Sequence, residues 1–106
     1  MQATAAMPSW LHAANDGADS LLDVAVTGAD RHAGRACRLV GEWQGRLLLQ
    51  LGVGDHDDNV ALARFFAEAL GVPAVRVSVV GGVTSMRKTV RLAGVGQRQA
   101  LLCLAP

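Results

Sequence analysis

The chain has 106 residues, a length that suits one domain and leaves no room for a second hydrophobic core. Apolar residues make up 51% of it, enough for one core, whereas an aromatic content of 4% argues against a row of stacking platforms for nucleic-acid bases. The formal net charge of +1 argues neither for nor against an acidic partner, so the distribution of charge says more than its sum.

Residues 1–20 are rich in Ala and polar side chains and predict a loosely ordered N-terminal segment. Pro8 and the turn-forming run Asn15-Asp16-Gly17 interrupt any regular element there. Within this segment, we expect only Trp10 and Leu11 to fold back onto the domain.

Two segments in the first half of the chain alternate between apolar and polar side chains, which is the pattern of a half-buried strand. These strands are predicted at residues 21–27 and 46–51. Residues 28–36 are typical of a loop, and residues 37–40 predict at most a short additional strand. The side chains expected to face the core are Leu22, Val24, Val26, Leu47, Leu49 and Leu51.

Helical spacing marks residues 58–70, the best-signalled element of the chain. Asp55, Asp57 and Asp58 offer N-cap oxygens and negative charge at its start, and Gly71 followed by Pro73 ends it. The apolar stripe consists of Leu62, Phe65 or Phe66, Ala69 and Leu70.

Two further strands are predicted at residues 75–80 and 88–93, with Val90 and Leu92 facing inward, followed by a short helix over residues 97–104. The resulting order is β-β-α-β-β-α. It indicates a single α+β domain over residues 21–106, in which a sheet and helices form a two-layer sandwich.

Cys37 and Cys103 lack the spacing of a zinc ribbon or a redox motif, so both are expected to be free thiols in a reducing compartment. The first residues show no signal-peptide pattern, and no segment approaches the roughly 20 apolar residues of a membrane span. We therefore expect a cytoplasmic, monomeric protein that does not enter a membrane.

A series of short sequence words runs along nearly the whole chain, about residues 8–104. The words are Pro8-Ser9-Trp10-Leu11, LLDVAV (21–26), Asp58-Asn59, Ala61-Leu62 with Phe66, Leu70-Gly71-Val72, VSVVGG (77–82), Thr84-Ser85, Lys88, Val90-Arg91-Leu92 and Gly94. In this order they resemble the YggU-like family, a group of small proteins whose function is not established. The resemblance implies a mixed four-stranded sheet with helices packed on one face.

The chain departs from that family's pattern at three places. Where the first strand usually ends in Pro, it has Gly28. The loop before the first helix keeps only Asn59 of a Gly-Lys-Ala-Asn word, and Asp57 stands near the expected Lys. In a Gly-x-x-Ser-Arg-x-Lys word, Met86 replaces the Arg, with Arg87 next to it. The resemblance therefore implies no function that depends on basic residues in these two loops.

Residues 82–88 (GVTSMRK) combine glycine, two hydroxyls and two cations, which are the groups that an anion site needs. The spacing is not that of a Walker A loop, and the alternative is a solvated hairpin connection whose glycines serve turn geometry. In the anion-site hypothesis, the residues that position the loop are Gly82 and Ser85, and those that contact phosphate are Arg87, Lys88 and Arg91.

Other candidate sites have simpler explanations. The run Asp55-His56-Asp57-Asp58 offers ligands to a divalent cation, but helix N-capping accounts for the same residues. Gly52-Val53-Gly54 lacks the third glycine of a dinucleotide-binding loop. The three histidines lie in separate polar segments and form no recognisable catalytic set. No metal or cofactor is therefore predicted, and an enzymatic activity stays an open alternative that no residue set in the sequence favours.

The charge distribution supports one hypothesis of function. The first thirty residues contain four Asp and no Lys or Arg, whereas no acid follows Glu68. The cations after Glu68 are Arg76, Arg87, Lys88, Arg91 and Arg98. This local excess predicts weak, largely sequence-independent binding of RNA or another phosphate-bearing ligand. The alternative is a protein-interaction or scaffold module without catalysis, which would dock through a sheet edge.

Overall fold

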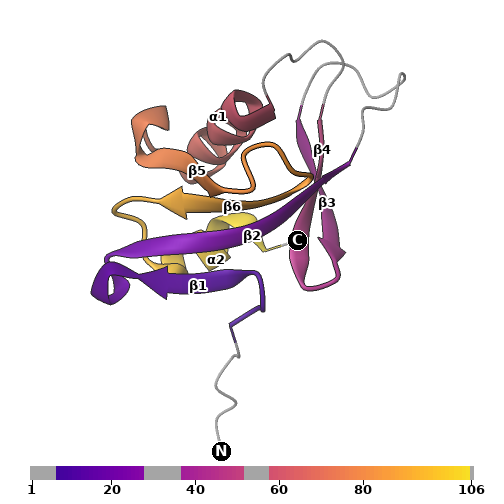
Figure 1. Ribbon diagram of the computed structural model, residues 1–106. Helices are drawn as coiled ribbons and strands as arrows, with labels where there is room; N and C mark the ends of the chain where they lie inside the picture. Colours follow the sequence, from indigo (N-terminus) through magenta and orange to yellow (C-terminus); the bar gives the residue numbers. More distant parts are fainter. Residues whose placement is uncertain (1–6, 28–36, 52–57, 106) are drawn as a thin grey trace, which may run out of the picture.

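The computed structural model describes residues 7–27, 37–51 and 58–105 (Figure 1). In chain order its elements are β1 (Leu11–Ala14), the 3₁₀ turn η1 (Asn15–Gly17), β2 (Asp19–Thr27), β3 (Arg38–Trp43), β4 (Arg46–Gln50), α1 (Asp58–Leu70), the 3₁₀ turn η2 (Ala74–Arg76), β5 (Val77–Gly81), β6 (Arg87–Leu92) and α2 (Gln97–Leu104).

Strand β2 is the centre of a mixed sheet with the order β3-β4-β2-β6-β5. β6 pairs antiparallel along one edge of β2. On the other edge, β1 pairs antiparallel with the first half of β2, and β4 pairs parallel with the second half. The α+β class and the mixed sheet agree with the prediction. The prediction of four strands is wrong, because the sheet has six strands within the described residues. The predicted order β-β-α-β-β-α is wrong for the same reason, since four described strands precede α1.

The two additional strands come from segments with weak strand patterns. β1 lies within residues 1–20, for which little regular structure was predicted, and Leu11 is the only one of its side chains that is buried. β3 extends beyond the short strand predicted at residues 37–40, and its exposed side chains hide the alternation. Both strands are held by main-chain hydrogen bonds to a stronger neighbour, which a pattern of side chains does not report.

One face of the sheet forms the hydrophobic core. The predicted inward residues Leu22, Val24, Leu47, Leu49, Val90 and Leu92 are all fully buried. Trp10 is also fully buried, and Leu11 is nearly so. Side chains from the N-terminal segment therefore complete the core, as expected for these two residues.

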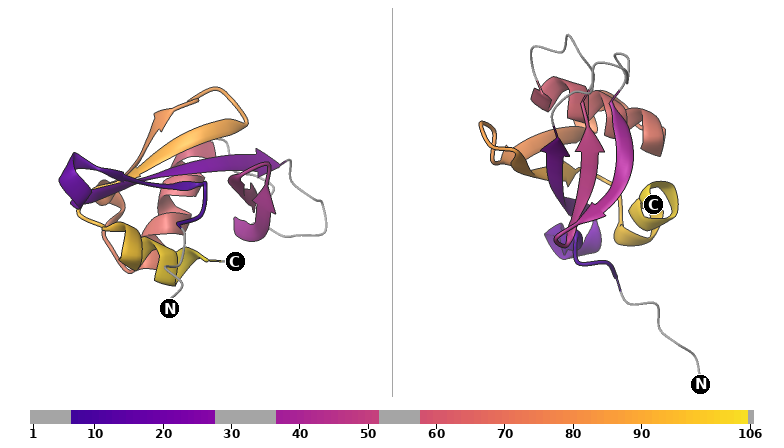
Figure 2. Two further views of the ribbon diagram at one scale, coloured as in Figure 1. Left: turned by 90° about the horizontal axis from the view of Figure 1, so that it is seen from below. Right: turned by 90° about the vertical axis from the view of Figure 1, so that its right-hand side faces the viewer.

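Both helices cover this same face of the sheet (Figure 2). α1 contributes the buried side chains Leu62, Phe66 and Leu70, as predicted, whereas Ala69 of the predicted stripe is exposed and Ala67 is buried instead. Gly71 has a φ of +69°, the left-handed conformation that ends a helix at little cost in glycine. No described helix covers the opposite face, which is called the open face below.

Candidate functional site

The loop that joins β5 to β6 is shaped by its own hydrogen bonds. The Ser85 amide donates to the Gly82 carbonyl (2.9 Å), and the Arg87 amide donates to the Ser85 hydroxyl (3.0 Å). Gly82 has a φ of +67°, and a Cβ atom at this position would collide with the Arg87 carbonyl oxygen. Only glycine fits there, so Gly82 and Ser85 determine how the loop presents the side chains that follow.

Lys88 lies on the helix side of the sheet and is only 2% exposed. Its ammonium donates to the carbonyl oxygens of Gly82 (3.1 Å) and Val83 (2.9 Å). Asn59, in the first turn of α1, donates from its side-chain amide to the same Val83 carbonyl (3.1 Å). Lys88 and Asn59 thus attach the loop to the domain from the helix side of the sheet. This position differs from the expectation that Lys88 contacts phosphate.

Arg91 points to the open face but has a carboxylate partner there. Its guanidinium donates to Asp19 Oδ2 through Nη2 (2.6 Å) and Nε (3.2 Å), while the Gly94 amide donates to Asp19 Oδ1 (2.7 Å). The Gly94 amide and, after it, the Arg91 guanidinium hold the pKa of Asp19 below its ordinary value. Because Asp19 balances its charge, Arg91 adds less positive charge to the surface than the sequence suggested.

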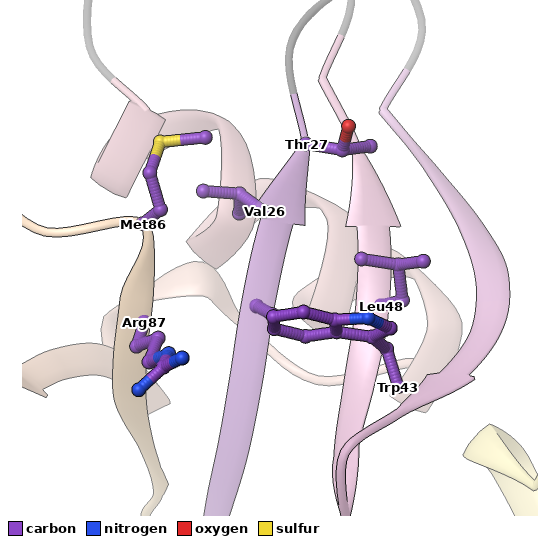
Figure 3. Close-up of a pocket in the computed structure, with 7 residues that line it drawn as sticks. Val26, Thr27, Trp43, Leu48, Met86 and Arg87 are labelled. Atoms are coloured by element: carbon purple, nitrogen blue, oxygen red, sulfur yellow. The ribbon is translucent and has the colours of Figure 1, made fainter.

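Arg87 is the predicted site residue that borders a cavity on the open face (Figure 3). The cavity has a volume of about 340 Å³ and is lined by Ala25, Val26, Thr27, Trp43, Leu48, Met86 and Arg87. Trp43 reaches from the end of β3 toward Arg87, whose guanidinium carbon lies 5.7 Å from the centroid of the indole ring. This is the geometry of a cation–π contact, so the arginine and the ring hold each other beside the cavity.

Trp43 was not among the predicted site residues, although the residues that follow it indicate its position. Gln44 and Gly45 both have positive φ (49° and 76°), which is the two-residue hairpin turn that lets Trp43 pair with Arg46. Alternation counted back from Leu47, which faces the core, then places Arg46 and Trp43 on the open face. The indole remains 42% exposed there, so it is accessible from solvent.

Three arginines on the open face have no carboxylate partner within the described parts of the chain: Arg38, Arg46 and Arg87. The side chain of Arg38 donates to Gln50 (2.9 Å), and that of Arg46 donates to the Val24 carbonyl (3.3 Å). The uncompensated charge therefore extends across β6, β4 and β3, whereas the sequence placed it in the C-terminal third. Arg98, one of the predicted cations, lies on α2, in the helix layer.

No protein-family model matches the chain, so the resemblance to the YggU-like family stays a prediction. In the described residues, no three His, Cys, Asp or Glu side chains are grouped as metal ligands would be, and His12 instead pairs with Asp23 at 2.8 Å. No described helix is long and apolar enough to cross a membrane. Gly28, His32 and residues 52–57, where a metal site and most of the helix N-cap were considered, lie outside the described residues.

Proposed function

We propose that the protein binds single-stranded RNA through the open face of its sheet, with Arg87 at the centre of the contact. The observation that carries this proposal is the Arg87 guanidinium beside the exposed Trp43 ring at the edge of a cavity. A guanidinium forms paired hydrogen bonds with a phosphate, and an exposed aromatic ring provides a surface on which an unpaired base stacks. A duplex buries the faces of its bases, so this combination favours a single strand.

The charges on the open face support the same proposal. Arg38, Arg46 and Arg87 come from three strands and have no described carboxylate partner, so an extended phosphate backbone that crosses the sheet passes all three. Binding releases counterions from each neutralised phosphate, which is the main source of affinity for such a surface. In this proposal Gly82, Ser85 and Lys88 position Arg87 rather than contact the RNA.

The test is a salt titration of a fluorescent single-stranded RNA with the full chain. For wild type we expect micromolar binding at about 50 mM salt that weakens steeply as salt rises, with a log–log slope of roughly −0.7 per neutralised phosphate. The Arg38→Gln/Arg87→Gln double variant should bind more weakly, and its slope should be shallower by about 1.4 because two phosphate contacts are lost.

Arg98→Gln is the matched control, since it removes a positive charge from α2 and leaves the open face intact. Its salt slope should equal that of wild type. The proposal is wrong if wild type does not bind RNA at low salt, or if the Arg98 variant loses as much of the slope as the open-face double variant does.

A second candidate function, docking of a protein strand, is favoured by one feature of the sheet. β5 lies at the end of the strand order, and only β6 pairs with it among the described strands. Val75 and Val80, just before and within β5, are 89% and 53% exposed. Substituting Val80 with Lys should abolish capture of a protein partner from lysate and leave RNA binding unchanged. A partner retained at its original level after this substitution would argue against the edge as the docking surface.

A further inference from the structure

We infer that the open-face cavity is a stacking site for one unpaired nucleobase, which makes the RNA contact depend on bases as well as phosphates. This inference rests on the proposed function and names the part of the RNA that the site takes. It arises from the cavity itself, because phosphate binding alone needs neither an exposed indole nor an apolar floor.

The lining of the cavity fits a planar heteroaromatic ring. Ala25 and Leu48 are paired across β2 and β4 and form an apolar floor between the indole of Trp43 and the loop. Met86, 51% exposed, lies on the loop side and offers a polarisable thioether to a ring edge. A base that lies on the Trp43 ring therefore contacts apolar atoms below, while its outer edge stays hydrated.

Thr27 and Arg87, at the rim of the cavity, offer polar groups to the edge of the base and to the phosphate, which the apolar floor does not bind. The Thr27 hydroxyl is drawn at the far end of the cavity from Arg87, within the same lining (Figure 3). A hydroxyl both donates and accepts, so it pairs with the edge of any base and imposes little sequence preference. Arg87 lies across the cavity, where its charge suits the phosphate attached to the stacked base.

The intrinsic fluorescence of Trp43 can report whether a base is bound at this site. The chain has two tryptophans, of which Trp10 is fully buried in the core and Trp43 is 42% exposed in the cavity. A stacked base quenches the fluorescence of Trp43, whereas Trp10 reports whether the domain is folded. Titrating the protein with RNA and following intrinsic fluorescence therefore observes the stacking event itself.

The deciding experiment compares a single-stranded RNA with an abasic ribose-phosphate strand of the same length and charge. Wild type should bind the abasic strand about tenfold more weakly and without quenching, because stacking on an aromatic ring is lost. Trp43→Leu should weaken RNA binding by about the same factor, remove the difference in affinity between the two strands, and keep the wild-type salt slope because no cation is lost. Trp43→Phe, which keeps an aromatic face, should restore most of the affinity for RNA.

Several outcomes would overturn the inference. Equal affinity for the two strands, or wild-type RNA binding by a folded Trp43→Leu variant, would exclude a base site and leave the salt-dependent phosphate surface standing. If adenosine monophosphate quenches Trp43 with the same affinity as RNA, the base comes from a free nucleotide and not from a strand. If wild type binds neither strand, the proposed function fails and the base site fails with it.

Discussion

At the scale of single residues, Asp19 shows how this domain stabilises a buried carboxylate. One of its oxygens accepts a hydrogen bond from the Gly94 amide and the other accepts two from the Arg91 guanidinium, and these donors stabilise the negative charge. Next to Asp19, the buried Ser20 hydroxyl donates to the Val95 carbonyl (2.7 Å). These two residues of β2 attach the central strand to the turn that precedes α2.

Replacing Asp19 with Asn should destabilise the domain at neutral pH, because the new amide hydrogens would face the guanidinium of Arg91. The folded state holds the pKa of Asp19 below its ordinary value, so the carboxylate stabilises the fold at pH values above the unfolded pKa of about 4. This contribution is lost as pH falls through the folded pKa. Thermal denaturation from pH 7 down to pH 3 should therefore show a difference in Tm between wild type and variant that shrinks with acidification.

Arg91→Gln is the matched control, since it removes the ion pair and keeps the hydrogen bond from Gly94. The Gly94 amide is the larger cause of the lowered pKa, so this variant should lose less stability than Asp19→Asn. A constant difference in Tm between wild type and Asp19→Asn at every pH would contradict the role given to the carboxylate.

At the scale of elements, the β5–β6 hairpin depends on a buried cation for the shape of its loop. We expect Lys88→Met to loosen residues 82–86, since it removes the ammonium that donates to the Gly82 and Val83 carbonyls. A hydrogen bond from a charged donor contributes roughly 1.5–3 kcal/mol, so the amides of Ser85 and Arg87 should exchange at least about tenfold faster. Amides within α1 serve as internal controls, and unchanged exchange in the loop would show that Lys88 does not hold it.

Helix α1 packs on the sheet with Phe66 among its fully buried side chains, and this ring meets Phe65 edge to face at 5.3 Å between ring centroids. Phe66→Ala should lower the free energy of unfolding by about 3–5 kcal/mol, because it leaves a cavity in the core. Phe65→Ala removes the same groups from a half-buried position and should cost less. Denaturant melts measure both, and a loss below about 1 kcal/mol for Phe66→Ala would contradict its place in the core.

At the scale of the whole molecule, the sequence predicted the elements that bury a regular apolar face and missed those that do not. The spacing of apolar residues predicts the strands that contain Leu22, Leu47 and Val90 and the helix that contains Phe66. β1 and β3 have no such regular spacing and depend on pairing with neighbouring strands. Lys88 alternates with Val90 and Leu92, so the strand pattern by itself places its side chain on the core face. Its charge instead favoured a position in solvent, and its burial is explained by the nearby carbonyl groups that accept its hydrogen bonds.

The candidate site was harder to predict because it combines residues from four strands and one loop. Arg87 was identified from the loop, but its partner Trp43 lies 44 positions earlier in the chain. Nothing local links the two residues. Their strands, β3 and β6, have β4 and β2 between them, and the two side chains meet because Trp43 reaches across the open face toward Arg87. This arrangement follows from strand order, which local sequence patterns do not reveal.

The central position of β2 also matters while the chain is being synthesised. Residues 19–27 leave the ribosome long before residues 87–92, yet β6 is the strand that pairs with residues 20–25 along one edge of β2. Until then the nascent chain carries an unpaired edge of the kind that joins with other chains, and its distant partner is slow to arrive. Asp19 and Asp23 lie on this strand. Charged side chains on a strand discourage such association, so we expect the carboxylates that later meet Arg91 and His12 to reduce association of chains whose sheet is unfinished.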